Sequence, residues 1–290
     1  MRARNLAISS SALRGLALTG LLFAAAVPHS AANAAKMSGS DACMAQQSTP
    51  EERLAGCTAM LTKHNARKEE QVIAYCNRGY ALTDLEQYDR VIADSNMAIR
   101  INPKEPCGYL NRGRAFFYKK NLDRALADYA QTIKLDPGYH EAFANRGTVY
   151  HERREFARAV REYDIAIMID ANVAMYYRDR ANSRSNLAEY SQAIDDLSRA
   201  IEIEPTTGDL HFRRGNMAIE LGRLDAAIAD YTKAISLAPD EQSYLRARER
   251  AYEQKGEAAL ARADHEQALR LESERFRKML QSANTSATRR

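Results

Sequence analysis

Glycine and proline are scarce in this 290-residue sequence, at 13 and 7, and tryptophan is absent. Because glycine and proline interrupt regular structure and populate tight turns, their low number argues against a turn-rich β protein and favours helices. Apolar residues make up 45% of the chain and charged residues 28%, which is typical of a soluble globular protein. The length allows one or two domains.

The short motifs of the common catalytic sites are also missing. The sequence has no glycine-rich dinucleotide loop, no Walker loop, no HExxH and no GxSxG. Its histidines are scattered, and the repeats described below take up nearly all of the chain that follows residue 71. We therefore predict that the protein is not an enzyme and needs no cofactor. An enzyme is kept as a contrasting hypothesis, which activity on a small substrate would support.

An apolar segment at residues 15–27 is too short to span a bilayer, which takes about twenty residues. Three arginines precede it, and residues 32–34 read Ala-Asn-Ala, which fits the small-x-small cleavage rule. We predict that residues 1–34 are a cleaved signal peptide, and that the protein is exported to the periplasm or secreted, without an integral membrane span after processing. A retained amphipathic anchor or a single span is the alternative.

Neither sign of charge is in large surplus. The chain has 42 Lys and Arg against 38 Asp and Glu, and loss of residues 1–34 would leave 39 against 38. Binding to nucleic acid depends on a basic surplus that neutralises phosphates. The balance therefore argues against nucleic acid as a partner.

Cysteine is limited to four residues, Cys43, Cys57, Cys76 and Cys107, with no C-x-x-C among them. A zinc site is therefore not expected, and we predict no metal. In an oxidising compartment these residues would form disulfides, for which three connectivities exist. We favour Cys43 with Cys57, and Cys76 with Cys107 as a possible second pair. The alternative is free thiols.

A repeat of thirty-four residues runs through the rest of the chain. The tripeptide Asn-Arg-Gly recurs at 77–79, 111–113 and 145–147, and small and branched apolar residues recur in register with it. Within one unit, apolar spacing predicts helices over 72–85 and 88–101, and Pro103 ends the second. A two-helix unit cannot bury its apolar face alone, so neighbouring units must stack into a solenoid.

These columns resemble the tetratricopeptide repeat family. The family signature of aromatic, glycine and alanine positions maps onto Phe143, Gly147, Tyr150, Ala159, Tyr163 and Ala166. The resemblance implies an all-α fold, a right-handed superhelical solenoid of stacked antiparallel helix pairs. Its six units are 72–105, 106–139, 140–173, 174–207, 208–241 and 242–275. Two units depart from the signature, with Arg184 in an aromatic slot and with Glu249 and Ser273 in the slots of glycine and proline.

Segments outside the six units are interpreted as caps. Residues 35–71 are predicted to hold a leading helix with Ser48 as its N-cap and Glu51 three residues later. It resembles the cysteine-bearing helix that precedes the repeats in exported bacterial members of the family, and Cys57 could tie an extended segment at Cys43 over the first repeat. Residues 276–290 are predicted to be the end of a polar capping helix followed by a disordered tail from residue 282.

An arginine recurs in every unit, and a carboxylate follows it sixteen residues later. The arginines are Arg78, Arg112, Arg146, Arg180, Arg214 and Arg248, and the carboxylates are Asp94, Asp128, Glu162, Asp196, Asp230 and Asp264. Since the two columns lie at the same height in an antiparallel hairpin, we predict a ladder of structural ion pairs. A cationic stripe that grips acidic ligands is the competing interpretation.

In this family the first helix of each unit lines the concave surface, which implies a ligand groove here. The residues assigned to it are Asn77, Tyr80, Asn111, Arg114, Phe117, Tyr118, Asn145, His151, Arg178, Asn182, Arg213 and Asn216. Asparagines could hydrogen-bond an extended peptide, aromatics could supply contact area, and arginines could receive carboxylates. Some of these positions could instead be ordinary solvated helix residues.

Together these features predict a non-enzymatic interaction module or scaffold of the bacterial cell envelope, which binds a peptide or protein segment in the groove. The alternative is a structural subunit that assembles an envelope complex through its convex face or terminal helix. The sequence indicates neither the identity of the partner nor an oligomeric state.

Overall fold

The computed structural model describes residues 39–45 and 47–287, and every regular element in that part of the chain is an α-helix. The chain divides into two units, Met1–Met37 and Ser38–Arg290, and only the second is described below. The predicted signal peptide, residues 1–34, lies outside the described residues. Among the described helices, none combines the length and the apolar character that crossing a membrane requires.

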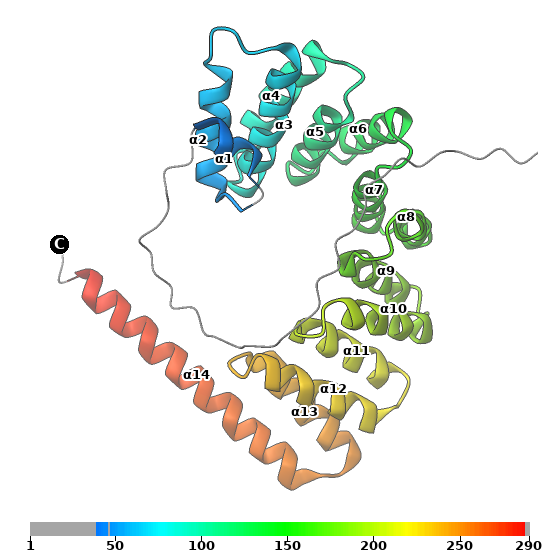
Figure 1. The fold of residues 1–290 in the computed structure, drawn as a ribbon. Helices are drawn as coiled ribbons and strands as arrows, with labels where there is room; N and C mark the ends of the chain where they lie inside the picture. Colours follow the sequence, from blue (N-terminus) through cyan, green and yellow to red (C-terminus); the bar gives the residue numbers. More distant parts are fainter. Residues whose placement is uncertain (1–38, 46, 288–290) are drawn as a thin grey trace, which may run out of the picture. The chain divides into compact units, whose positions relative to one another are not determined.

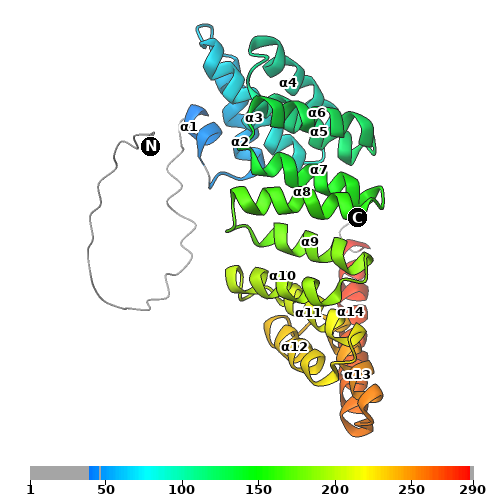
Figure 2. The same cartoon turned by 90° about the vertical axis from the view of Figure 1, so that its right-hand side faces the viewer.

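Six antiparallel hairpins follow one another in chain order, as Figures 1 and 2 show. Each hairpin packs against the next, so the fold is a helical repeat solenoid. The hairpins are α3 (Lys68–Asp84) with α4 (Tyr88–Ile101), α5 (Pro106–Tyr118) with α6 (Leu122–Leu135), α7 (His140–Glu152) with α8 (Phe156–Ile169), α9 (Ala174–Asn186) with α10 (Tyr190–Ile203), α11 (Gly208–Glu220) with α12 (Leu224–Leu237), and α13 (Gln242–Lys255) with α14 (Ala258–Ala287).

Close packing inside a hairpin depends on the glycine of the repeat. A Cβ atom added at Gly113 would lie 2.7 Å from the Tyr129 ring, and one added at Gly215 would lie 2.6 Å from the Tyr231 ring. Both tyrosines are almost fully buried. The glycine therefore lets the aromatic ring of the second helix rest directly on the backbone of the first.

The turn inside each hairpin repeats one backbone conformation. A residue with positive φ recurs every thirty-four positions, and only the last two of the six are glycines. The residues are Glu86, Lys120, Arg154, Ala188, Gly222 and Gly256, with φ between 57° and 83°. The left-handed region is unfavourable for residues with a Cβ, so the packing of the two helices imposes the turn on four of the six units.

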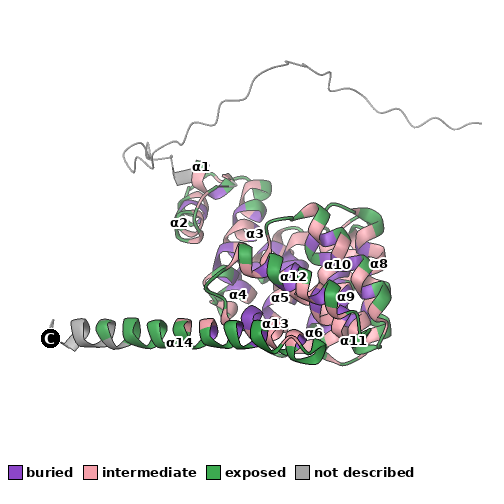
Figure 3. Ribbon diagram, turned by 90° about the horizontal axis from the view of Figure 1, so that it is seen from below, coloured by how far each residue is buried: buried purple, intermediate pink, exposed green. Residues whose placement is uncertain are grey.

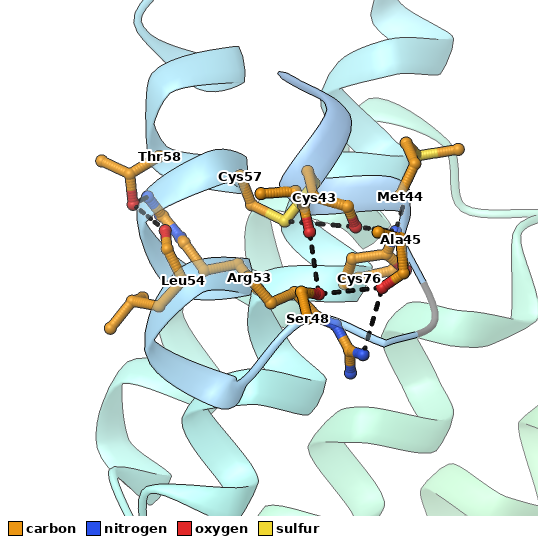
Figure 4. The surroundings of a disulfide bond; sticks show 12 residues. Cys43, Met44, Ala45, Ser48, Arg53, Leu54, Cys57, Thr58 and Cys76 are labelled. Atoms are coloured by element: carbon orange, nitrogen blue, oxygen red, sulfur yellow. Dashed lines mark hydrogen bonds between the residues drawn. A yellow bond between two sulfur atoms is a disulfide. The ribbon is translucent and has the colours of Figure 1, made fainter. Parts of the chain in front are cut away.

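Two short helices, α1 (Gly39–Met44) and α2 (Pro50–Leu61), cover the first hairpin. The predicted leading helix is thus present, but its N-cap is Thr49 and not Ser48, because Glu52 completes a reciprocal capping box with Thr49. Ser48 instead donates its hydroxyl to carbonyl oxygens of Ala42 and Ala45 (Figure 4).

Both cysteine pairs are disulfide-bonded in the structure. Cys43 and Cys57 have their Cα atoms 4.6 Å apart and join α1 to α2 (Figure 4), and Cys76 and Cys107 have theirs 5.9 Å apart and join α3 to α5. The segment at Cys43 was expected to be extended. It is helical, because residues 39–44 form a turn of helix that packs on α2 and α3.

The last helix is longer than the sequence suggested. Helix α14 continues to Ala287, so residues 282–287, expected to lie in a disordered tail, are helical. Neither glycine nor proline occurs between Ala258 and Ala287 to end the helix. Residues 272–279 of α14 are exposed, as the green part of this helix in Figure 3 shows, whereas the beginning of α14 packs on α13.

Candidate binding face

The first helices of the hairpins form the inner side of the stack. Helix α3 contacts α5, α5 contacts α7, α7 contacts α9, and α11 contacts α13. Among the described residues, the second helices of consecutive hairpins make no comparable contact with one another. Since the first helices lie closer together than the second ones, the face they line, here called the inner face, is the hollow side of the repeat array.

The arginine column and the carboxylate column come together in all six units. The Nε atom of each arginine lies between 2.7 and 3.0 Å from a carboxylate oxygen of the residue sixteen positions later. In five units the guanidinium binds both carboxylate oxygens, whereas Arg146 directs Nε and Nη2 to the same oxygen of Glu162. The side chains of Arg180 and Asp196 are only 14% and 4% exposed, so this pair is largely removed from water.

The same arginines also bind the preceding hairpin, which sequence reasoning missed. Their Nη1 atoms donate to a polar residue on the second helix of the unit before, in most cases sixteen positions earlier. These acceptors are Asn96, Asp164, Ser198 and Thr232, and Thr58 of α2 accepts from Arg78. Arg146 has Ala130 at that position, whose side chain has no acceptor. The sequence signal for this second contact is the recurrence of a polar residue at one repeat position, in steps of thirty-four or sixty-eight residues.

An aromatic ring lies under four of the ladder arginines, three residues before each in sequence. The guanidinium carbons are 5.5 or 5.6 Å from the ring centroids of Tyr75, Tyr109, Phe143 and Tyr177. Hydrogen bonding to Asp94 raises the pKa of Arg78 above its usual value, in spite of partial burial. Every ladder arginine is therefore engaged on several sides by the protein itself, which leaves little for a ligand.

Two of the asparagines assigned to the groove are used between helices. Asn111 is 1% exposed and donates from Nδ2 to the Cys76 carbonyl at 2.9 Å, so it does not reach the inner surface. Asn77 donates in the same way to the Cys43 carbonyl at 3.0 Å. Helix α1 thus takes the place that the first helix of a preceding repeat would occupy. Gly79 explains the burial of Asn111, because the Asn111 side chain fills the space that a Cβ at residue 79 would need.

The aromatic residues of the first two units lie partly against the protein. The guanidinium of Arg114 is 5.3 Å from the Tyr80 ring centroid, and the ring of Tyr118 stacks on Tyr88 at 5.0 Å. Phe117 contacts the edge of Tyr118 and packs on the core below it. Tyr118, which is 48% exposed, therefore lies beside the turn of the first hairpin and not at the middle of the inner face.

Units three to five carry most of the polar side chains of the inner face. Arg178 and Arg213 are 37% and 38% exposed, and Asp179 and Asp209 pair with them. The other residues of this set make specific contacts: Asn182 accepts from Arg213, Asn216 accepts from Tyr231, and His151 Nδ1 lies 2.9 Å from Ser183 Oγ.

Asn145 differs from the asparagines at the equivalent positions of units one and two. Within the part of the chain that the structure describes, its side-chain amide has no hydrogen-bond partner, and it is half-buried. Its donor and acceptor are therefore available to the backbone of a bound segment. No cluster of three or more metal-ligating side chains exists among the described residues.

A solenoid of helical hairpins with a partly exposed polar face of this kind defines a class of protein, the repeat proteins that act as protein-interaction modules. Models of the tetratricopeptide repeat match residues 72–105, 110–173 and 208–241. The chain belongs to the tetratricopeptide repeat family, whose members are in general non-catalytic and bind protein or peptide partners.

Solved structures show the same fold. MamA is 26% identical with a TM-score of 0.55, over 57% of this chain and 96% of that chain. PilF of Pseudomonas aeruginosa is 13% identical with a TM-score of 0.63, over 70% and 93%. YrrB, described as a protein of this family with an unusual peptide-binding site, is 18% identical with a TM-score of 0.52, over 66% and 97%. No curated protein sequence matches the chain.

Proposed function

We propose that this protein is a non-enzymatic interaction module of the bacterial cell envelope, which holds a peptide or protein segment against its inner face. The observation that carries the proposal is a row of polar side chains on consecutive first helices that still reach solvent, although its arginines, Arg178 and Arg213, also pair with Asp179 and Asp209. Asn145 has a free amide, and Arg178 and Arg213 are each more than one-third exposed. An extended segment needs amide partners and carboxylate receptors at such intervals.

We also propose that the protein is exported, on the basis of its cysteines and its predicted signal peptide. All four cysteines lie in disulfides, which persist in oxidising compartments such as the periplasm. We propose that the ladder arginines hold the hairpins together and do not bind the partner, since each is occupied by a carboxylate of its own unit.

Photo-crosslinking in intact cells tests the proposal. A photoreactive residue in place of Asn145 should capture a defined partner, and one in place of Met168 should not. Met168 is the control because it is 78% exposed but lies on a second helix, α8. Equal capture from both positions, or capture from Met168 alone, would contradict a binding site on the inner face.

The terminal helix favours a second candidate function, a subunit that assembles an envelope complex through its end. Leu269 occupies the position held by Ile99, Ile133, Ile167, Ile201 and Ile235 in the earlier units, where each is partly covered, yet Leu269 is 44% exposed. Phe276 is 56% exposed. A chain ending after Leu271 should lose such a complex, while substitutions at Asn145 and Arg178 should leave it intact.

A further inference from the structure

The N-terminal part of the inner face contains a cavity that the groove residues of the sequence analysis define only in part, through Asn77 and Tyr80. It has a volume of about 340 Å³ and is called the Ile73 pocket here. Its apolar walls come from Val72, Ile73, Cys76 and Tyr80 of α3, together with Cys107 of α5 and Tyr139 before α7. This volume is at the low end for ligand pockets, so it suits one or two side chains and not a large cofactor.

Ile73 is an apolar residue of α3 whose side chain stays partly exposed at the pocket. It is 40% exposed, although its neighbours Val72 and Cys76 are buried. The same repeat position holds Cys107, Glu141, Met175, Asp209 and Ser243 in the later units. Ile73 and its counterpart Cys107 both border this pocket, and Ile73 is the aliphatic member of the pair, with further apolar walls around it.

The walls of the pocket are fixed before any ligand binds. The disulfide between Cys76 and Cys107 joins α3 and α5, which both line the pocket, and the hydrogen bond from Asn111 to the Cys76 carbonyl adds a second link. Burial raises the pKa of Tyr80, and the adjacent Tyr139 and Glu141 raise it further, so the Tyr80 wall stays neutral. A preformed site loses less conformational freedom on binding.

The rim of the pocket is acidic. Glu69 and Glu105 line it, and Glu141 is near enough to raise the pKa of Tyr139, in addition to the effect of burial. Within the described residues none of these three carboxylates has an ion-pair partner. Arg114 lies over the ring of Tyr80, and Arg67, which pairs with Glu70, is close enough to Glu69 for that charge to raise its pKa slightly, after the larger effect of Glu70. The rim therefore attracts a positive charge on the ligand.

We propose that the Ile73 pocket receives a large apolar side chain of the bound segment, and that Glu69 and Glu105 select segments in which Lys or Arg flanks that side chain. This inference rests on the proposed function and names the chemistry of the partner at one end of the inner face. The apolar side chain supplies affinity through burial, and the carboxylates supply the choice between partners.

Three short labelled peptides of glycine and serine test it, with Lys-Leu-Lys, Glu-Leu-Glu or Lys-Ser-Lys at the centre and blocked ends. Their affinities for the full protein are measured by fluorescence anisotropy at low and high salt. We expect the Lys-Leu-Lys peptide to bind, with a loss of about tenfold for Lys-Ser-Lys and of about fivefold or more for Glu-Leu-Glu. The affinity of the Lys-Leu-Lys peptide should fall as salt is added, because salt screens the attraction between lysine and carboxylate.

The variants Ile73→Ser and Glu69→Gln with Glu105→Gln separate the two contributions. Ile73→Ser should lower the affinity for the Lys-Leu-Lys peptide by about tenfold. The double charge variant should bind the Lys-Leu-Lys and Glu-Leu-Glu peptides equally well. Met175→Ser is the matched control, because Met175 has the same repeat position and is 45% exposed, and it should change neither. Circular dichroism checks that each variant remains folded.

Failure of this inference differs from failure of the proposed function. If Asn145 still captures a partner but Ile73→Ser leaves both the capture and the peptide affinity unchanged, the pocket has no role and only the further inference is wrong. No binding of the Lys-Leu-Lys peptide at about 1 mM would likewise overturn it. If Asn145 captures nothing while peptides still bind in an Ile73-dependent way, the pocket stands and the wider groove does not.

Discussion

The ion-pair ladder makes a strong prediction about Arg112, which holds the second hairpin together. Its Nε and Nη2 atoms bind Asp128 at 2.9 and 2.8 Å, and its Nη1 atom reaches Asn96 of the preceding hairpin at 2.7 Å. The Asp128 side chain is 8% exposed and has no other cation within the described residues. Replacing Arg112 by Met therefore leaves a buried carboxylate without a counter-charge.

We expect Arg112→Met to lower the free energy of unfolding by about 3 kcal/mol, the lower end of the cost of breaking a buried pair. For a chain of this size that corresponds to a melting temperature about 6–12 °C lower. Since neighbouring units supply much of the stability of a repeat array, the transition should also broaden as the second hairpin loosens first.

The double variant Arg112→Met with Asp128→Leu distinguishes a stranded charge from lost packing. Removing both charges should restore most of the stability, to within about 1 kcal/mol of the natural chain. Urea unfolding followed by far-ultraviolet circular dichroism measures all three proteins, and Lys134→Met, at an exposed site on α6, serves as the control. If the single variant is as stable as the natural chain, or the double variant no better than the single one, the structural role of the ladder is refuted.

Three further predictions concern other positions of the repeat. Ala130→Asn supplies the acceptor that Arg146 lacks, and since residue 130 is exposed, it should raise the free energy of unfolding by about 0.5–1 kcal/mol in urea titrations. Gly222→Ala places a Cβ in the left-handed turn where nothing lies within 4 Å of it, so it should cost about 1 kcal/mol of stability through backbone strain alone. Burial would raise the pKa of Glu249, but hydrogen bonds from basic side chains of α13 and α14 outweigh it and lower the pKa. A lowered pKa stabilises the fold above the usual carboxyl range, so Glu249→Gln should cost about 1 kcal/mol at neutral pH, and thermal melts should converge as the pH falls through that pKa.

The repeat period carried most of what could be predicted about the fold. Apolar spacing and Pro103 set the helices of the first hairpin at 72–85 and 88–101, and the structure has them at Lys68–Asp84 and Tyr88–Ile101. The structure places hairpins at 174–207 and 242–275 as well, which the matched family models do not cover. Stacking on neighbouring units explains this, because the unit at 174–207 is covered on both sides and the last unit packs on the hairpin before it.

Contacts between units were less predictable than those within a unit. A sixteen-residue spacing in one hairpin fixes the height of two side chains, so the pairing of arginine with carboxylate could be inferred. The second partner of Arg180, Asp164, and the burial of Asn111 both depend on how far the preceding hairpin approaches, which no spacing inside a unit specifies. Two adjacent hydroxyl residues, Ser48 and Thr49, could each cap α2. Thr49 is the cap because Glu52 accepts a hydrogen bond from its backbone N–H.

One repeat position shows how the end of the array changes what a residue can do. At the asparagine position the amide binds a carbonyl of the preceding first helix in units one and two, from Asn77 to Cys43 and from Asn111 to Cys76. In unit three the equivalent Asn145 has no such partner among the described residues. The closed N-terminal units thus offer an apolar pocket, and free hydrogen-bonding groups begin at unit three. A segment bound along the inner face would therefore place its apolar anchor near α3 and its exposed backbone near α7 to α11. In the reversed direction, the apolar anchor and the exposed backbone would each lack complementary groups on the protein, so the inner face favours one direction of binding.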